Sequence, residues 1–272
     1  MHSPGELAAQ ARSLIRSVVS RHDAHYGFGS MSSAVYDTAW VSLITKTIAG
    51  EKQWLFPQCF QYVLDAQLPD GGWAGTASQV DGILNTGASL LALSRHAREP
   101  LQLDGENLRQ RIERAVKSLQ GQLTAWDVAA ASHVGFEIIV PALLTYLSGE
   151  GYEFAFEGRD LLLSFQRKKL TGFKPEYLYG SVKSTALHSL EAFVGQIDFD
   201  RVAHHKALGS MMASPSSTAA YLMHASTWDD EAEAYLRHVV SVSPDADGGV
   251  PSAYPSTYFE YTWVSSPGFV SG

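Results

Sequence analysis

Apolar residues recur at intervals of three and four along almost the whole sequence, and this helical periodicity narrows the possible folds more than any other feature. One such stripe consists of Tyr36, Trp40, Leu43, Ile44 and Ile48. It predicts a helix over residues 33–44 with one buried face. Ser32 or Ser33 is expected to cap its start, because a short hydroxyl accepts hydrogen bonds from the free amides of the first turn.

The same periodicity predicts helices through the rest of the chain, over residues 6–20, 56–67, 79–98, 104–121, 133–148, 157–168, 183–195, 215–226 and 228–241. Clusters of Gly, Pro and Asp separate these segments. No run of strict alternation is long enough to predict a strand in a sheet. The expected fold class is all-α, built from helix pairs packed side by side, with few strand residues between 56 and 241.

Composition excludes several classes of protein. Hydrophobic residues make up 45% of the 272 residues and charged residues 18%, which is enough apolar surface for a substantial core. A net charge of −8 argues against a nucleic-acid partner. The apolar runs are too short to span a bilayer, so no membrane partner is expected. Cys59 is the only cysteine, which excludes an internal disulfide and favours a cytoplasmic protein.

The string Q-L-P-D-G-G-W, from Gln67 to Trp73, marks a turn at the end of a predicted helix. Gln67 is expected to hydrogen-bond the helix end, and Trp73 to pack against neighbouring helices. Helix pairs closed by such turns suggest an α/α barrel. Turn chemistry alone also fits α/α-barrel glycosidases and the prenyltransferase β subunit.

Six strings in order carry a resemblance to one family. S-A-V-Y-D-T-A-W-V, from Ser33, resembles the S-A-Y-D-T-A-W-V-A segment of the class II diterpene cyclases, the copalyl diphosphate synthase type, and Q-L-P-D-G-G-W resembles their Q-x-x-D-G-x-W motif. The other four are V-G-F-E-I-I-V-P from Val134, A-L-H-S-L-E-A-F from Ala186, S-P-S-S-T-A-A-Y-L from Ser214 and G-G-V-P-S-A-Y-P from Gly248. The sequence of these strings is most similar to the N-terminal part of the fungal bifunctional copalyl diphosphate/ent-kaurene synthases.

The resemblance implies an α/α-barrel γ domain with the first part of a β domain. Residues 1–50 would belong to the β domain, 51–250 to the γ domain and 251–272 to the return towards a truncated β domain. The helix over 33–44 would then pack on β-domain helices further along the family's sequence and lack partners here. The end of the chain, rich in Pro, Gly and Ser after Val264, is typical of a truncation.

The full-length enzymes that the chain resembles cyclise geranylgeranyl diphosphate after protonation by the middle acid of a D-x-D-D motif. That motif is absent, because Asp245-Ala246-Asp247-Gly248 lacks the fourth acid. The chain is therefore interpreted as the N-terminal region of such a synthase. The alternative is a truncated or pseudoenzyme module that at most binds prenyl diphosphate or a partner chain. An unrelated α/α-barrel hydrolase has no motif support.

His188 and Ser252 are the candidate catalytic residues. His188 matches a family histidine that works with an Asn in G-G-V-P-N to activate the water that removes the last proton, and an imidazole suits such a base. Ser252 stands where that Asn is expected. His188 and Glu191 are three residues apart, which predicts one shared helix face. A histidine merely packed under a helix is the alternative.

The candidate substrate-binding residues are Lys169, Glu137, Trp40 and Tyr254. Lys169 lies near the family lysine that contacts the diphosphate, though it equally fits a solvated helix end. Glu137 is the acid of the G-F-E string. Trp40 and Tyr254 could line a carbocation pocket by cation–π attraction, or simply pack in the core.

Support for a bound Mg²⁺ is weak in the sequence. The family places an acidic cluster shortly before the G-F-E string to hold Mg²⁺, and only Asp127 stands in that region here. Asp229-Asp230-Glu231-Ala232-Glu233 imitates the D-D-x-x-D metal motif of class I terpene synthases. Acids in a first turn also complement the helix dipole, so a helix start is the preferred interpretation of these residues.

Overall fold

The computed structural model describes residues 3–103, 108–243 and 246–265, and most of them are helical. The α-helices are α1 (Pro4–Ser20), α2 (Val35–Ser42), α3 (Pro57–Asp65), α4 (Gln79–Arg98), α5 (Leu108–Ala125), α6 (Phe136–Gly149), α7 (Arg159–Leu170), α8 (Pro215–His224), α9 (Asp230–Ser241) and α10 (Thr257–Ser265). Short 3₁₀ helices are η1 (Val128–Ala130), η2 (Pro175–Leu178), η3 (Thr185–Phe193) and η4 (Phe199–His205). The all-α prediction is confirmed. Between residues 56 and 241 the described part contains isolated bridges but no strand.

A β-hairpin is an element type that the sequence analysis did not predict. Strands β1 (Thr45–Ile48) and β2 (Glu51–Trp54) are antiparallel, with Thr45 opposite Trp54 and Ile48 opposite Glu51. Ala49 and Gly50 have φ of +52° and +87°, as a two-residue hairpin turn requires. Four residues per strand are too few for alternation to stand out in the sequence. Ile48 thus belongs to a strand and is exposed, and is no part of the helical stripe.

Helix α2 is shorter than predicted and is capped differently. Its N-cap is Ala34, which makes no side-chain cap. The predicted cap by Ser32 or Ser33 was therefore wrong. The Ser33 hydroxyl instead donates a hydrogen bond to Asp247 Oδ1 at 3.1 Å, which ties the start of α2 to the chain after α9.

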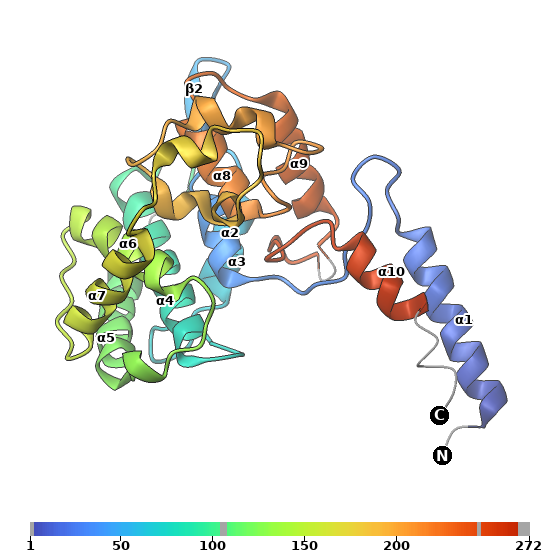
Figure 1. The fold of residues 1–272 in the computed structure, drawn as a ribbon, viewed down its shortest axis with the longest axis horizontal. Coiled ribbons are helices and arrows are strands. Elements are labelled where there is room, and N and C mark those ends of the chain that lie inside the picture. The colour runs from blue at the N-terminus through green and yellow to red at the C-terminus, as the bar shows by residue number, and fades with distance from the viewer. Residues whose placement is uncertain (1–2, 104–107, 244–245, 266–272) are drawn as a thin grey trace.

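Helix α2 lies at the centre of the helical body and packs against α3, α4 and α8 (Figure 1). Trp40, Leu43 and Ile44 are buried together in one core, as predicted, with Tyr36 partly buried against it. The expectation that this helix lacks partners was wrong. Helices from later in this chain surround it on several sides, so its apolar stripe is covered without any further domain.

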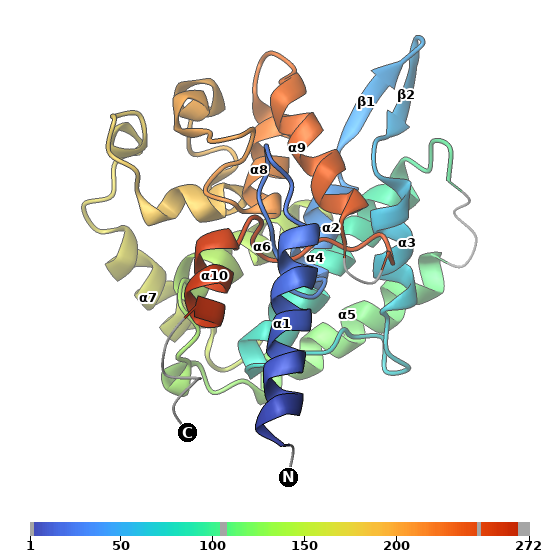
Figure 2. The same cartoon turned by 90° about the vertical axis from the view of Figure 1, so that its right-hand side faces the viewer.

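Helices α1 and α10 extend away from the body and lie side by side (Figures 1 and 2). The exposed apolar side chains of α1 are Leu7, Leu14, Ile15 and Val19, at 53%, 53%, 46% and 62% of their full area. We call residues 22–30 and 254–257, which join this pair of helices to the body, the neck. Across it the Phe28 amide donates to Thr257 Oγ1 at 2.7 Å, and Ser256 N donates to Phe28 O at 3.0 Å.

The Gln67 to Trp73 turn follows α3 in the chain and contacts α5. The fully buried Trp73 indole donates from Nε1 to Val63 O at 2.8 Å, so it satisfies a carbonyl near the end of α3. Gln67 Nε2 donates to Gly71 O and to Arg111 O of α5, at 3.0 and 3.1 Å. Gly71 has φ of +92° and its Cα faces the α5 backbone closely, so a side chain there would be strained and would clash. The predicted packing of Trp73 is confirmed, and Trp73 also makes the hydrogen bond to the end of α3 that was expected of Gln67.

Within the described residues, no helix combines the length and the apolar character that crossing a bilayer requires.

Candidate functional site

His188 lies on the surface in η3, and its Nδ1 is 3.1 Å from Met212 O. The helix is interrupted at Ser189, where φ is −139° and ψ is 44°. The interruption rotates the residues that follow, so His188 is exposed whereas Glu191 is buried. The predicted shared face of His188 and Glu191 was therefore wrong.

Ser252 lies on the surface in the loop that leads into the neck. In the same loop Tyr254 N donates to Ala213 O at 2.8 Å, next to the Met212 carbonyl that faces His188. The fold therefore attaches the two candidate catalytic segments to adjacent residues of one turn. Nothing in the sequence spacing predicts this proximity, because it depends on the turn before α8.

Tyr254 itself is buried, and its hydroxyl lies 2.9 Å from His238 Nε2 and 3.3 Å from Gly27 O. These contacts make it part of the packing at the neck. Burial raises its pKa to about 12, so the hydroxyl keeps its proton in any ordinary buffer. Its predicted place in a carbocation pocket remains a prediction.

Lys169 and Glu137 pair with each other. Lys169 Nζ of α7 is 2.9 Å from Glu137 Oε1 of α6, and the side chains are 58% and 16% exposed. Sequence analysis assigned both to substrate binding but did not predict the ion pair. An anion that approaches Lys169 must compete with a carboxylate already in contact.

Trp40 is buried between rings rather than at a surface. Its ring contacts Tyr146 edge-on at 6.0 Å and Tyr36 at 6.5 Å. Its indole Nε1 has no hydrogen-bond partner among the described residues. This location is that of a core residue, as the sequence analysis offered as its alternative.

Two buried acids, Asp37 and Glu191, lie next to Trp40 and were not identified from the sequence as a site. They are 5% and 2% exposed. The Tyr36 hydroxyl donates to Glu191 Oε1 at 3.1 Å, and Ser216 N donates to Asp37 Oδ1 at 3.4 Å. Burial raises the pKa of Asp37 to about 7 and that of Glu191 to about 8, and the nearby Asp37 adds to the second shift. The only sequence signal was an acid inside each of two apolar strings.

Asp127 caps the short helix η1. Its Oδ1 accepts hydrogen bonds from Ala129 N and Ala130 N at 3.0 and 3.3 Å. Across the described ranges, no group of three or more His, Cys, Asp or Glu residues could hold a metal ion. Mg²⁺ favours several oxygen ligands and water, so this single capping carboxylate does not fit a magnesium site by itself.

Asp229 begins helix α9, as the sequence analysis preferred. It accepts hydrogen bonds from Glu231 N and Ala232 N at 3.1 and 3.0 Å, and Lys206 pairs with it.

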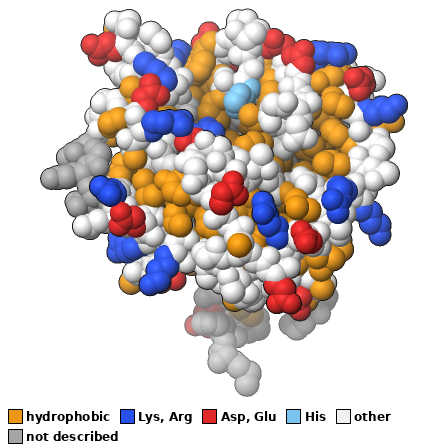
Figure 3. All heavy atoms as spheres, turned by 90° about the vertical axis from the view of Figure 1, so that its left-hand side faces the viewer, with side chains coloured by type: hydrophobic (Ala, Val, Ile, Leu, Met, Phe, Trp, Pro, Cys, Tyr) orange, Lys and Arg blue, Asp and Glu red, His pale blue; other side chains and the backbone are white. Residues whose placement is uncertain are grey.

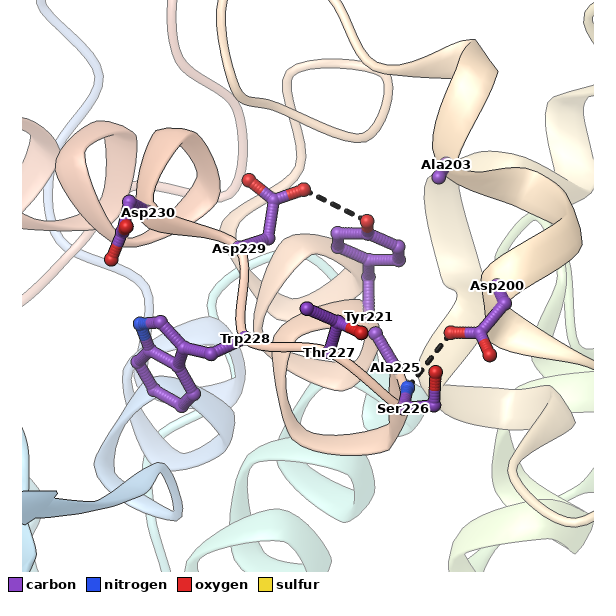
Figure 4. A pocket seen from close by; sticks show the side chains of 9 residues that line it. All are labelled: Asp200, Ala203, Tyr221, Ala225, Ser226, Thr227, Trp228, Asp229 and Asp230. Atoms are coloured by element: carbon purple, nitrogen blue, oxygen red, sulfur yellow. Dashed lines mark hydrogen bonds between the residues drawn. The ribbon is translucent and has the colours of Figure 1, made fainter.

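Asp229 and Asp230 line a pocket of about 370 Å³, in which the Tyr221 hydroxyl donates to Asp229 Oδ2 at 2.8 Å (Figure 4). A second pocket, of about 590 Å³, lies beside Trp73 and the start of α4. Neither contains a residue predicted for the site. Asp245 lies outside the described residues.

The face of the molecule opposite α1 and α10 carries both signs of charge, with apolar side chains exposed between them (Figure 3). Such mixing differs from the basic stripe of a nucleic-acid-binding surface.

Comparison with known proteins gives a consistent result. The chain is 57% identical over 268 residues to "Copalyl diphosphate synthase" of Talaromyces verruculosus. The match covers 97% of this chain and 28% of that protein. It is 47% identical over 267 residues to "Ent-kaur-16-ene synthase" of Fusarium fujikuroi, covering 95% of this chain and 28% of the relative. No family model matches the chain.

The fold agrees with these sequence matches. A crystal structure of ent-copalyl diphosphate synthase from Arabidopsis thaliana, in complex with (S)-15-aza-14,15-dihydrogeranylgeranyl thiolodiphosphate, matches with a TM-score of 0.74 at 28% identity. The match covers 94% of this chain and 35% of that one. This chain is similar to the N-terminal part of the diterpene cyclases.

The chain also matches abietadiene synthase from Abies grandis, with a TM-score of 0.74, 26% identity, and coverage of 94% of this chain and 32% of that one. The chain spans just over a quarter of the length of the curated relatives. The resemblance drawn from the six strings is thereby confirmed, whereas the roles of individual residues stay predictions.

Proposed function

We propose that this chain forms the base-bearing wall of a class II diterpene cyclase site, which acts on geranylgeranyl diphosphate and yields copalyl diphosphate. The observation that carries the proposal is His188. Its imidazole is exposed, one nitrogen faces a backbone carbonyl, and the loop of Ser252 attaches next to that carbonyl. Names of the relatives, and the prenyl diphosphate analogue bound in one solved relative, support the substrate class.

In this proposal His188 accepts the final proton from the cyclised carbocation through a water molecule. Ser252 would help to hold that water, because a hydroxyl both donates and accepts. A serine side chain is shorter than asparagine, so the water would lie nearer the Ser252 backbone than with the family residue. Tyr254, a buried residue of the same loop, would keep the loop in place.

The reaction also needs an acid that protonates an alkene. The two acids that are protonated near neutrality, Asp37 and Glu191, are 5% and 2% exposed and lie in the core, where a substrate has no access. Asp247 Oδ1 already accepts hydrogen bonds from Gly249 N and the Ser33 hydroxyl. We therefore propose that the initiating acid comes from elsewhere in a longer enzyme.

Lys169 is proposed to attract the diphosphate. The Glu137 carboxylate must be displaced or screened, so Mg²⁺ carried by the diphosphate would assist. The alternative function, a module that binds prenyl diphosphate or a partner chain without catalysing a reaction, shares this contact.

Residues 1–50 and 251–272 are proposed to belong to a β domain, and residues 51–250 to a γ domain. A cytoplasmic location is proposed as well, because the single cysteine is buried and free, which is compatible with that compartment.

The test uses two forms of the protein. The 272-residue chain is incubated with geranylgeranyl diphosphate and Mg²⁺, dephosphorylated and assayed for copalol, and no product above the enzyme-free control is expected. In a longer form that contains the D-x-D-D motif, His188→Ala should lower cyclisation or divert it to hydroxylated products. His204→Ala is the matched control, because His204 is also exposed and also contacts a carbonyl, Gly180 O, at 2.8 Å. Equal effects of both substitutions would refute the role of His188.

A further inference from the structure

The turn around His188 is held by a neighbouring helix rather than by its own hydrogen bonds. The interruption at Ser189 leaves Leu187 O and Leu190 N without regular helical partners, and both residues are buried. A buried backbone group without a partner is unfavourable, so both groups need partners from elsewhere. The Ser217 hydroxyl of α8 supplies both.

Ser217 Oγ donates to Leu187 O at 2.7 Å and accepts from Leu190 N at 3.1 Å. A hydroxyl is among the smallest side-chain groups that can donate and accept at once. Ser217 is fully buried, so water does not compete for these bonds. One side chain therefore closes the turn on both sides of His188.

The next residue of α8 fixes the carbonyl that faces the imidazole. Thr218 Oγ1 accepts from Met211 N at 2.9 Å and donates to Ser214 O at 2.7 Å. Met212 and Ala213 have φ of +51° and +59°, a region that non-glycine residues adopt only when their surroundings enforce it. The Thr218 bonds, together with the bond from Ser214 N to Met211 O at 2.9 Å, provide that enforcement.

The carbonyl also determines which imidazole nitrogen carries the proton. Met212 O can only accept a hydrogen bond, so Nδ1 of a neutral His188 must be the donor. Nε2 then carries the free lone pair.

We propose that Ser217 and Thr218 are positioning residues that hold His188 as the Nδ1–H tautomer, with Nε2 as the proton-accepting atom. Ser217 fixes the backbone on which the ring is carried, and Thr218 fixes the carbonyl that selects the tautomer. The importance of this arrangement for catalysis rests on the proposed function of His188, but the arrangement itself does not.

The test is nitrogen-15 NMR of the 272-residue chain labelled at histidine, because the shifts of the two ring nitrogens distinguish the tautomers. His188 is assigned by loss of its signals in His188→Gln. The wild-type chain above neutral pH should show Nδ1–H alone. Ser217→Ala and Thr218→Val should each lose this single-tautomer pattern, and Thr218→Ser, which keeps the hydroxyl, should retain it.

Ser94→Ala is the matched control. Ser94 is a buried serine of α4 whose hydroxyl donates to Leu90 O within its own helix at 2.7 Å, so its loss should leave His188 unchanged. If Ser217→Ala does not fold, Thr218→Val decides, because valine has the shape of threonine. A wild-type chain with the proton on Nε2, or foldable variants with unaltered His188 signals, would overturn the proposal. Neither result depends on cyclase activity. If the Ser217 and Thr218 variants lose the single tautomer but His188→Ala leaves the longer enzyme unaffected, the proposed function is refuted and the positioning role of Ser217 and Thr218 is not.

Discussion

The Tyr36 hydroxyl and the Glu191 carboxylate are joined by a hydrogen bond of 3.1 Å between residues 155 positions apart. It links α2 to η3 inside the core. Asp37, the residue next to Tyr36, is also buried, so two acids share one apolar interior. The fold tolerates them because each has polar neighbours and because burial favours the protonated form.

These acids should make the chain less stable as the pH rises. In the unfolded chain Asp37 and Glu191 titrate near 3.8 and 4.5, and in the folded chain near 7 and 8. Between about pH 4 and 8 the folded state binds more protons than the unfolded state, so the free energy of unfolding falls as pH increases. Glu191→Gln cannot ionise and should flatten this fall, as measured by urea unfolding at pH 5.5 and 8.5. Glu113→Gln, at an exposed acid, is the control and should keep the wild-type slope. An unchanged slope in Glu191→Gln would contradict the assignment.

His96 should make the free energy of unfolding fall as the pH is lowered below neutrality, opposite to the effect of the two buried acids. It is buried, its Nε2 lies 3.0 Å from Ser42 O, and its ring stacks on Phe60 at 3.6 Å. Burial lowers its pKa to about 4, so the unfolded state binds the extra proton between pH 6.5 and 4, and stability is lost as the pH falls through that range. His96→Gln should be less stable at pH 7 by roughly 1–3 kcal/mol but lose less on acidification. The exposed His204→Gln should behave like wild type in the same unfolding series.

Trp73→Phe should destabilise the chain by about 1–3 kcal/mol, because it removes the hydrogen bond to Val63 O and leaves a cavity at a fully buried site. Urea unfolding at constant pH measures the change. Trp228→Phe, at a partly exposed indole bonded to Glu233, should have a smaller effect. A reversed order would show that the turn is not the stronger anchor.

The exposed face of α1 should make the isolated chain bind a hydrophobic dye and self-associate. Replacing Leu14 and Ile15 together by Ser should reduce both, while the free energy of unfolding changes by less than about 0.5 kcal/mol, as for other surface positions. Gln10→Ser on the same helix is the control. Dye fluorescence and light scattering provide the measurements, and undiminished dye binding in the double variant would place the apolar surface elsewhere.

Local patterns predicted local structure well. Helix α4 spans residues 79–98, as its periodicity indicated, because Ser78 caps it and its apolar positions recur throughout. The hairpin was missed because its strands are four residues long. The partners of α2 were misjudged because they come from helices more than a dozen residues away, which periodicity does not report.

The candidate site was predicted only in its residue types. The resemblance identified His188, Lys169 and Glu137, but the Lys169 to Glu137 ion pair and the turn that brings Ser252 near His188 depend on tertiary packing. Asp37 and Glu191 each look like an isolated acid in an apolar string. Only the folded chain shows that they are neighbours.

The neck has a consequence for the order in which the chain folds. Its hydrogen bond from Phe28 N to Thr257 Oγ1 joins residues 229 positions apart. Closing a flexible loop of that length has an entropic cost of about 5 kcal/mol, which a few hydrogen bonds cannot offset alone. The helical body must shorten that loop first, so the neck should form late, and amide hydrogen exchange should find Phe28 and Ser256 among the first backbone positions to open.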